Sequence, residues 1–284
     1  MKYQIVDTLL RNSGATTFRP LSPVFVKPAE PFNPLYSLAI EDEYVLTNKH
    51  LHGYFELYYS LLKSLNRASN ARLCIIELGM GSIGNEKSTM KGFYEGMRRI
   101  HNLEYPFGGC LRLWERFFSK PPLLIGWDLE IDMDRIVWKN HNYVQVDTTD
   151  QVSLRLATAK TLSILEDKNA DGIDMFIDDG LHEPASQLSV MKAVYPYIKH
   201  GGYYIIEDVN VDGITYETGT NRFISFSCDT SAIIAAAAEI SGVAPQIYQF
   251  RGAGDQLSSI IVVNRSLISK NRSLSHPMDI GSSY

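Results

Sequence analysis

The chain has 284 residues, of which 45% are hydrophobic and 21% are charged, and its formal net charge is −5. This length is enough for one sizeable core with added elements, and the charge gives no basis for a surface that binds nucleic acid or an anionic membrane. The three cysteines are odd in number and lack metal-binding spacing, which suits a reducing cytosol. No signal peptide or apolar run of membrane-spanning length is evident, so we expect a cytoplasmic protein.

Residues 1–70 are predicted to form a cap or lid over the domain that follows. The repeated prolines of residues 19–34 forbid a regular helix and indicate an extended segment. Apolar and aromatic residues then recur at helical spacing over residues 50–65, so we expect a helix whose apolar stripe packs on the next domain. Residues 71–264 are predicted to form that domain, and residues 265–284 a flexible polar tail.

A glycine-rich loop, GMGSIG, follows an apolar run at residues 73–78 that is typical of a central parallel strand. Such a loop lets the backbone approach a ligand closely at the C-terminal edge of a sheet. A dinucleotide enzyme needs an acid about 20 positions further on, whereas here an insertion at residues 85–109 intervenes and the next strand ends at Asp128, 44 residues beyond Gly84. The pattern favours another adenosine cofactor, with Asp128 either accepting hydrogen bonds from the ribose hydroxyls or capping a helix.

Strand and helix patterns continue to alternate along the chain. A strand is predicted at residues 143–146, ending at Asp147, and Thr148 to Asp150 are expected to cap a helix at residues 152–166. The later predicted elements are a glycine-, threonine- and asparagine-rich loop at 210–229, a helix at 231–240, and strands at 246–250 and 259–263 joined by a turn at 252–255. The whole pattern predicts an α/β fold that is Rossmann-like and doubly wound, with a mostly parallel seven-stranded sheet and an antiparallel last strand.

Residues 173–209 predict a strand–helix–strand unit, with the helix at 184–197 and a Gly-Gly turn at 201–202 before the second strand. Strands joined by such a crossover are parallel, so their C-terminal ends lie at the same edge of the sheet. Both strands end in a pair of acids, the first in Asp178 and Asp179 and the second in Glu207 and Asp208. We therefore expect four carboxylates to converge at this edge.

Carboxylates gathered in this way repel one another and are normally held by a cation, or one of them keeps a proton. Oxygen ligands without cysteine favour Mg²⁺, Mn²⁺ or Ca²⁺. His182 follows Asp179 by three residues, in the turn before the helix, and its side chain can take a proton near neutral pH. Any one of these acids is more often a helix cap or a solvated loop residue, but together they predict a divalent-cation site beside a general base.

The segments ELGMGSIG, GGCLRLWERFF, GWDLE, VDTTD, IDDGLHEPASQ and GGYYIIEDV occur in the order found in metal-dependent O-methyltransferases that modify sugars of macrolides and related natural products. The chain resembles that family of class I S-adenosylmethionine-dependent enzymes over roughly residues 45–264. The most specific part is DDGxH followed by GGxYxIED, in which His182 and Glu207 lie 25 residues apart. Residues 47–54, TNKHLHGY, also resemble the family's TDK…HGY segment, with Asn48 in place of the usual Asp.

This resemblance implies a role for each matching residue. The implied cofactor-binding residues are Glu77, Gly79 and Gly81 at the methionine end, Asp128 at the ribose, Asp147 and Thr148 at the adenine, and Asp178. The implied ligands of Mg²⁺ are Asp179, Glu207 and Asp208. His182 would be the general base, so the catalytic pair is His182 with Asp179.

These features predict a Mg²⁺-dependent or Mn²⁺-dependent methyltransferase that transfers the methyl of S-adenosylmethionine to a hydroxyl of a small or medium-sized natural product. The proline-rich segment at 20–34 and the loop at 210–229 are expected to close over that substrate. Two alternatives stay open: transfer to a nitrogen or a catechol-like ring with the same cofactor, and a catalytically inactive, cofactor-binding scaffold. The sequence identifies neither the methyl acceptor nor a homo-oligomeric state.

Overall fold

The structure is a computed structural model. It describes residues 33–50, 52–68, 72–82, 90–209, 213–217, 222–226, 230–251 and 257–265. Most of the proline-rich segment, the turn at 252–255 and nearly all of the C-terminal tail therefore lie outside the described residues. None of the described helices combines the length and the apolar composition needed to span a bilayer.

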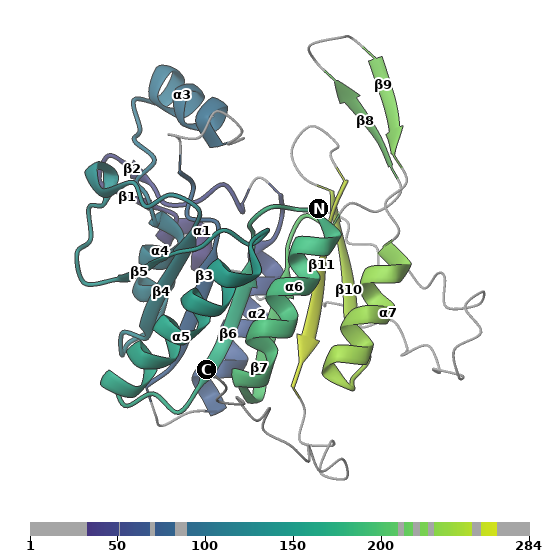
Figure 1. The fold of residues 1–284 in the computed structure, drawn as a ribbon. Coiled ribbons are helices and arrows are strands. Elements are labelled where there is room, and N and C mark those ends of the chain that lie inside the picture. The colour runs from purple at the N-terminus through teal and green to yellow at the C-terminus, as the bar shows by residue number, and fades with distance from the viewer. Residues whose placement is uncertain are drawn as a thin grey trace.

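A seven-stranded sheet forms the centre of the molecule, with the strand order β10-β11-β7-β6-β3-β4-β5 (Figure 1). Its strands are β3 (Cys74–Leu78), β4 (Leu123–Asp128), β5 (Asn142–Gln145), β6 (Ile173–Asp178), β7 (Ile198–Ile206), β10 (Gln246–Arg251) and β11 (Leu257–Asn264). The pairs from β7 to β5 are parallel, whereas β11 runs antiparallel to both β7 and β10. This confirms the predicted doubly wound sheet with an antiparallel last strand.

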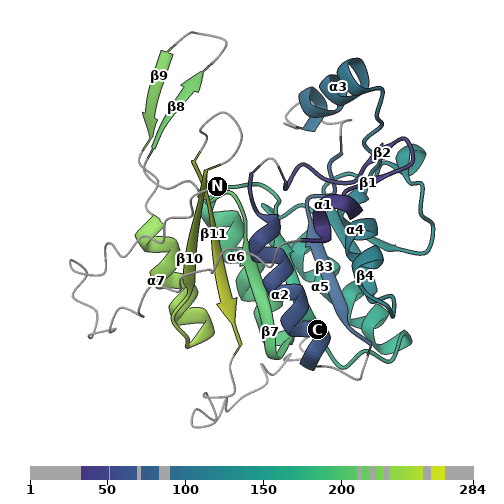
Figure 2. The same ribbon diagram turned by 180° about the vertical axis from the view of Figure 1, so that it is seen from behind.

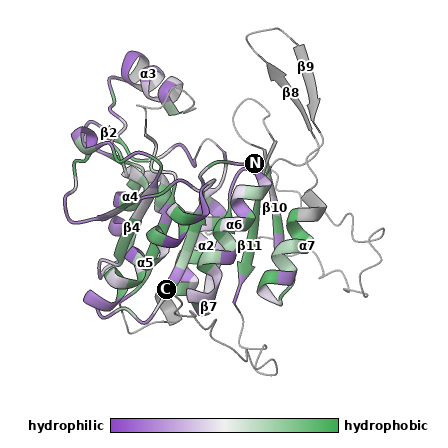
Figure 3. Ribbon diagram, in the orientation of Figure 1, coloured by the Kyte–Doolittle hydropathy of each residue, from purple (hydrophilic) through white to green (hydrophobic). Residues whose placement is uncertain are grey.

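Helices cover both faces of this sheet (Figures 1 and 2). One face packs on α5 (Gln151–Asp167), α6 (Pro184–Val194) and α7 (Thr230–Ser241), and the other on α1 (Leu35–Leu38), α2 (Phe55–Ala68) and α4 (Gly109–Phe117). Side chains alternate between the faces of a strand, so in β3 Ile76 packs on the first face and Ile75 on the second. Because both faces are covered, the central strands consist mainly of hydrophobic residues (Figure 3).

The predicted helix at 152–166 is confirmed as α5, and Asp150 is its N-cap. The Asp150 carboxylate accepts hydrogen bonds from the backbone N–H groups of Val152, at 2.9 Å, and Ser153, at 3.3 Å. These bonds satisfy two donors that have no partner within the helix. The cap fixes where the chain leaves the C-terminal edge of β5, next to Asp147 and Thr148.

The adjacent strands β3 and β6 mark the point at which the order of strands reverses across the sheet. Ligands of open α/β sheets bind outside the C-terminal ends of the strands at such a point. Here Gly79 follows β3 and Asp179 follows β6, and a Cβ atom on Gly79 would lie 1.9 Å from the Asp179 carbonyl oxygen. Gly79 also has a φ of +93°, so both its contact and its conformation require glycine.

The sequence predicts a turn at residues 201–202, but both glycines lie inside β7, which begins at Ile198. The strand pairs first through Ile198 and then, after a shift of register, through Tyr203. Gly201 has a φ of +84°, so it accommodates the extra residues of this bulge. The preceding helix, α6, ends at Val194 and is followed by the 3-10 turn η2 (Tyr195–Tyr197), where Pro196 has no N–H to continue the helix.

The sequence also predicts a loop at residues 210–229, and this is wrong for its described parts. β8 (Gly213–Glu217) and β9 (Arg222–Phe226) form a two-stranded antiparallel hairpin beyond the C-terminal edge of the sheet (Figure 1). Their sequences, GITYE and RFISF, contain β-branched and aromatic residues that favour a strand. Closure of this hairpin over a substrate stays a prediction.

The N-terminal region contacts the insertion. β1 (Ile40–Glu41) pairs with β2 (Tyr44–Val45), and β2 forms a bridge to Glu104 of the insertion. The insertion contains α3 (Met90–His101), and a further 3-10 turn, η1 (Met133–Arg135), follows β4. The sequence predicts a helix from residue 50, but α2 begins only at Phe55. Gly53, two residues before this start, has a φ of +78°, which is not a helical conformation.

Candidate metal and cofactor site

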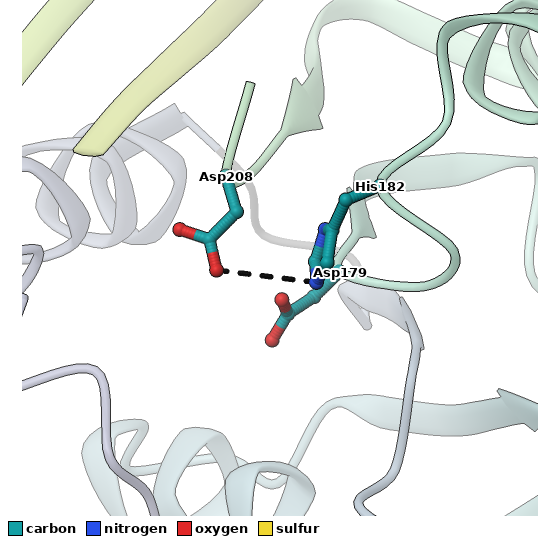
Figure 4. A group of neighbouring side chains, drawn as sticks. All are labelled: Asp179, His182 and Asp208. Atoms are coloured by element: carbon teal, nitrogen blue, oxygen red, sulfur yellow. Dashed lines mark ion pairs between the residues drawn. The ribbon is translucent and has the colours of Figure 1, made fainter. Parts of the chain in front are cut away.

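Three side chains point toward one another beyond the ends of β6 and β7: Asp179, His182 and Asp208 (Figure 4). One donor atom from each lies within 4.8 Å of the others, and His182 Nε2 is 4.0 Å from Asp208 Oδ2. Their side chains are 22%, 35% and 31% exposed. Two carboxylates and an imidazole that open to solvent are a donor set suited to a divalent cation.

The adjacent acid, Glu207, lies on the inner side of this group and is 1% exposed. It is bound by Lys49, whose side chain is also 1% exposed. Lys49 Nζ lies 2.8 Å from both carboxylate oxygens of Glu207, 2.8 Å from Asp179 Oδ2, and 3.2 Å from Oε1 of the buried Glu77. A single ammonium group therefore connects the acids at the ends of three adjacent strands, β3, β6 and β7.

Other donors to these acids come from the helices that cover the same face of the sheet. Tyr58 in α2 donates its hydroxyl to Glu207 Oε1, and Tyr54, just before α2, donates to Asp208 Oδ1. Trp114 in α4 donates its indole N–H to Glu77 Oε2 at 2.7 Å. The acids of the cluster are thus positioned by the ends of the strands, and side chains of the N-terminal region and α4 donate hydrogen bonds to them.

The buried groups of this cluster shift one another's pKa values. Burial opposes the charge on Lys49, but the carboxylates of Asp179 and Glu207 outweigh it, so the pKa of Lys49 lies well above its usual value. Burial, followed by the negative charge of Asp179, raises the pKa of Glu207 well above its usual value although Lys49 acts in the opposite direction. Burial likewise raises the pKa of Glu77. One ammonium faces three carboxyl groups here, and either a proton kept by a buried carboxyl or a divalent cation would balance the remaining negative charge.

Four of the residues predicted to bind the cofactor, Glu77, Gly79, Gly81 and Asp128, lie at the ends of β3 and β4 or in the glycine loop after β3. Asp128 is 8% exposed, and its carboxylate accepts hydrogen bonds from the backbone N–H groups of Met80, at 2.7 Å, and Glu130, at 3.2 Å. Burial raises its pKa, and these backbone donors act against that rise. Gly81 has a φ of +80°, and a Cβ atom there would lie 2.7 Å from the ring of Tyr105. Through its hydrogen bond to the Met80 N–H, the buried Asp128 holds the glycine loop in position.

Asp147 and Thr148 lie after β5, further from the acidic cluster. Asp147 Oδ1 accepts hydrogen bonds from the hydroxyl and the backbone N–H of Thr149, and these bonds lower its pKa. Thr148 is buried, and its hydroxyl oxygen accepts a hydrogen bond from Ser186 in α6 at 2.7 Å. Both side chains thus stabilise the turn that leads into α5.

Asp178 is separated from its neighbour Asp179 by the alternation of side chains. Its carboxylate is 1% exposed and accepts a hydrogen bond from the Tyr204 hydroxyl at 3.1 Å. Burial raises its pKa to about 7. The group of potential metal ligands found among the described residues contains neither Asp178 nor Glu207.

Sequence reasoning gave no role to Lys49, Tyr54, Tyr58 or Trp114. Both tyrosines belong to an apolar stripe that the sequence assigns to core packing, and Trp114 lies in a quoted segment without a role of its own. Two signals were present: the lysine lies in the TNKHLHGY segment, and the tyrosines are four residues apart, which places them on one side of the chain.

A separate hollow of about 850 Å³ lies at the opposite edge of the sheet, near the starts of β6 and β7. Among its lining residues is Lys199, whose Nζ lies 2.8 Å from Asp171 and 2.9 Å from Asp174. This hollow is far along β7 from Glu207, so it is not part of the acidic cluster.

Comparisons with known proteins point to natural-product O-methyltransferases. No family model matches the chain. Over 103 residues, which are 36% of this chain and 24% of the relative, it is 34% identical to the 8-demethyl-8-alpha-L-rhamnosyl tetracenomycin-C 2'-O-methyltransferase of Streptomyces olivaceus. It is 30% identical to the mycinamicin VI 2''-O-methyltransferase of Micromonospora griseorubida over 36% of this chain and 23% of that relative. The chain thus spans about a quarter of the length of these curated relatives.

One similar solved structure is the MycE methyltransferase from the mycinamycin biosynthetic pathway in complex with Mg, SAH and mycinamycin VI. It is 22% identical, with a TM-score of 0.38 over 55% of this chain and 32% of that chain. The curated relatives have the activity expected of the family that the sequence motifs resemble, so the similarity to sugar O-methyltransferases is confirmed over the part that they cover.

Proposed function

We propose that the chain is a metal-dependent O-methyltransferase that transfers a methyl group from S-adenosylmethionine to a hydroxyl of a small or medium-sized natural product. The observation that carries this proposal is the group of Asp179, His182 and Asp208 beside a glycine loop at the reversal point of the sheet. The curated relatives support it, because their names specify O-methylation of sugars or related positions on natural products.

S-adenosylmethionine would bind along the glycine loop. Gly79 and Gly81 have positive φ angles that let the backbone turn at the end of β3, and the buried Glu77 lies in that strand. Asp128 holds this loop through the backbone N–H of Met80, and its carboxylate would also accept hydrogen bonds from the ribose hydroxyls. Asp147 and Thr148 would shape the adenine side through the turn that they stabilise, and Asp178, which accepts a hydrogen bond from Tyr204 in β7, would support the cofactor from the end of β6.

Asp179 and Asp208 would hold the divalent ion at the open side of the cluster, with Glu207 as the third, inner ligand. Glu207 Oε1 accepts hydrogen bonds from Lys49 and Tyr58, whereas Oε2 accepts one from Lys49, which leaves an acceptor site on Oε2. When bound, Mg²⁺ or Mn²⁺ would orient the acceptor oxygen and stabilise its developing negative charge. The carboxylates would set the position of the ion relative to the glycine loop.

His182 would act as the general base. Its Nε2 faces Asp208 at 4.0 Å, and its side chain is 35% exposed, so a substrate hydroxyl can reach it. The proton of that hydroxyl would move to Nε2, a transfer that typically contributes about 10²–10⁴-fold to the rate. The same imidazole could instead ligate the ion, and the His182 variant described in the Discussion separates the two roles.

Removal of the metal tests this proposal directly. Methyl transfer to sugar-containing natural products should stop in EDTA and return with Mg²⁺, and Asp179→Asn should lose activity because it removes one charge while keeping the size of the side chain. Calorimetry should show that S-adenosylhomocysteine binds to the wild type and to Asp179→Asn, and more tightly than NADH. Full activity in EDTA would refute the metal-dependent mechanism, and cofactor binding without transfer to any acceptor would favour the scaffold.

A further inference from the structure

We propose that the ammonium group of Lys49 is a resident cation of the acidic site, which neutralises its buried carboxylates and lowers its affinity for a divalent ion. This inference rests on the proposed function, because it concerns ion binding by the same cluster. Lys49 is 1% exposed. It is a positioning residue that acts through Asp179 and Glu207.

Lys49 and the acids around it are unlike charges that are buried together. Lys49 and Glu207 are each 1% exposed, and Glu77 is fully buried. Charged groups removed from water in this way are stable only when they are paired and hydrogen-bonded. Lys49 Nζ meets this need with short contacts to both oxygens of Glu207 and to Asp179.

The lysine comes from a distant part of the sequence. It lies 130 residues from Asp179 and 158 residues from Glu207 in the sequence, on the segment that leads into α2. Because Tyr58 binds Glu207 from the same region, the segment brings one cation and one hydroxyl donor onto a single buried carboxylate. The N-terminal region therefore completes the inner side of the site rather than only covering it.

The ammonium also acts on a bound ion. A divalent cation bound to Asp179 would lie close to Lys49 Nζ, because the ammonium is 2.8 Å from the same carboxylate. Like charges at such a separation repel strongly, even at the effective dielectric constant of about 20 that describes protein interiors. Lys49 and the ion also compete for the acceptor sites of Asp179 and Glu207. Removal of the ammonium should therefore strengthen ion binding while it weakens the fold.

The test compares the wild type with Lys49→Met, which has a side chain of similar length without the charge. In EDTA, Lys49→Met should unfold roughly 5–20 °C below the wild type, because it leaves buried carboxylates without their partner. Calorimetric titration with Mn²⁺ alone should show binding at least about tenfold tighter than in the wild type. Mg²⁺ should accordingly raise the unfolding temperature of Lys49→Met more than that of the wild type.

Lys199→Met is the matched control. Lys199 also contacts two carboxylates, at 2.8 and 2.9 Å, but at the opposite end of β7. The control removes the same charge from the protein as Lys49→Met does. Because that charge lies far from the acidic site, its removal should leave the Mn²⁺ affinity unchanged. An unaltered unfolding temperature of Lys49→Met in EDTA, or Mn²⁺ affinity equal to or below that of the wild type, would overturn the inference.

Two further outcomes separate this inference from the proposed function. If none of these proteins binds Mn²⁺, the metal-dependent function fails, and the unfolding temperature in EDTA alone decides the role of Lys49. If Lys49→Met does not fold, the double variant Lys49→Met with Glu207→Gln removes the cation together with one carboxylate. Recovery of a folded protein in the double variant supports a charge-neutralising lysine, and continued misfolding assigns Lys49 to core packing.

Discussion

The inner and outer sides of the acidic site both contain carboxylates, but these lie in different surroundings. Glu77, Glu207 and Lys49 on the inner side are almost completely buried and bind one another, whereas Asp179, His182 and Asp208 are between 22% and 35% exposed. Both the inner and the outer acids accept hydrogen bonds from protein donors, but only the outer acids also face solvent, from which an ion and a substrate can come. Burial and partners, rather than residue type, separate a stabilising carboxylate from one available for chemistry.

The contrast is sharpest between two consecutive residues. Glu207 and Asp208 follow β7 directly, and their side chains point to different surroundings. Each accepts a tyrosine hydroxyl, Glu207 from Tyr58 and Asp208 from Tyr54, so the two sites differ mainly in Lys49 and in access to solvent. The chain is then expected to respond through stability when the inner side is changed and through activity when the outer side is changed.

The largest expected effect comes from the outer side. His182→Ala should reduce turnover by about 10²–10⁴-fold, because it removes the group that takes the hydroxyl proton. Affinities for Mn²⁺ and S-adenosylhomocysteine should stay at wild-type values, and the remaining activity should rise at high pH as the acceptor hydroxyl ionises without help. Steady-state kinetics and calorimetry on the same preparations would measure both.

His200→Ala is the control for this prediction, because His200 is exposed and lies at the other end of β7. It should keep full turnover. Loss of Mn²⁺ binding in His182→Ala would make His182 a ligand of the ion instead of the base, and normal turnover would remove it from the mechanism.

Asp128 tests whether a buried acid can serve a ligand as well as the fold. Asp128→Ala should weaken binding of S-adenosylhomocysteine by about 1.5–3 kcal/mol, the usual contribution of hydrogen bonds to a charged group. Asp128→Asn keeps an acceptor for the Met80 N–H, which the carboxylate binds at 2.7 Å. Equal losses in calorimetry for both variants would indicate direct contact with the ribose, and a loss in the alanine variant alone would indicate support of the loop. Unchanged affinity in both would leave Asp128 without a role in cofactor binding.

The sequence predicts the outer side of the site better than the inner side. Asp179 and Asp208 follow two strands of one crossover unit, and local periodicity is enough to place such strand ends together. Lys49 reaches Glu207 across 158 residues of sequence, and no local pattern encodes that contact. Tyr58 lies at a position of the apolar stripe that predicts core packing. The sequence pattern therefore gives no sign that its hydroxyl donates a hydrogen bond to Glu207.

The errors in the fold have a related origin. Glycine composition predicts a turn at residues 201–202 and a loop at 210–229, yet strand pairing determines the structure in both places. At Gly201 the pairing of β7 with β6 continues on both sides of the bulge, so the strand outweighs the local preference. Sequence composition reports what a segment prefers alone, while the neighbouring strand decides what it forms.

Tyr58 and Tyr54 allow a matched comparison of the inner and outer sides of the acidic site, because each donates its hydroxyl to one acid. Tyr58→Phe should lower the free energy of unfolding by about 1–2 kcal/mol, because a buried carboxylate loses a donor. Tyr54→Phe should cost less stability, because Asp208 is 31% exposed and water can replace the hydroxyl. Urea denaturation in EDTA would measure both changes, and Mn²⁺ titration should show that Tyr54→Phe has the larger effect on ion binding. The reverse order of the two stability losses would contradict the division between inner and outer sides.

The smallest expected effect provides a reference for a charge pair near the surface. Glu41 in β1 binds Arg112 in α4 through two hydrogen bonds, of 2.6 and 2.8 Å. This bonding lowers the pKa of Glu41 below its ordinary value of 4.5. A carboxyl whose pKa is lower in the folded state stabilises the fold above its unfolded pKa, and this stabilisation is lost as the pH falls through the folded value.

Glu41→Gln should therefore cost about 0.5–1 kcal/mol of stability at pH 7, the usual range for a partly exposed ion pair. The difference from the wild type should shrink as the pH falls below 4.5, the ordinary pKa of glutamate, because Glu41 then becomes neutral in the wild type as well. Urea denaturation across this pH range would measure it, with the exposed Glu130→Gln as the control that should show no such difference. If the Glu41→Gln loss persisted at low pH, it would arise from packing between β1 and α4. If the stability loss in Glu41→Gln equalled that in Lys49→Met, burial would not explain the strength of the Lys49–Glu207 pair.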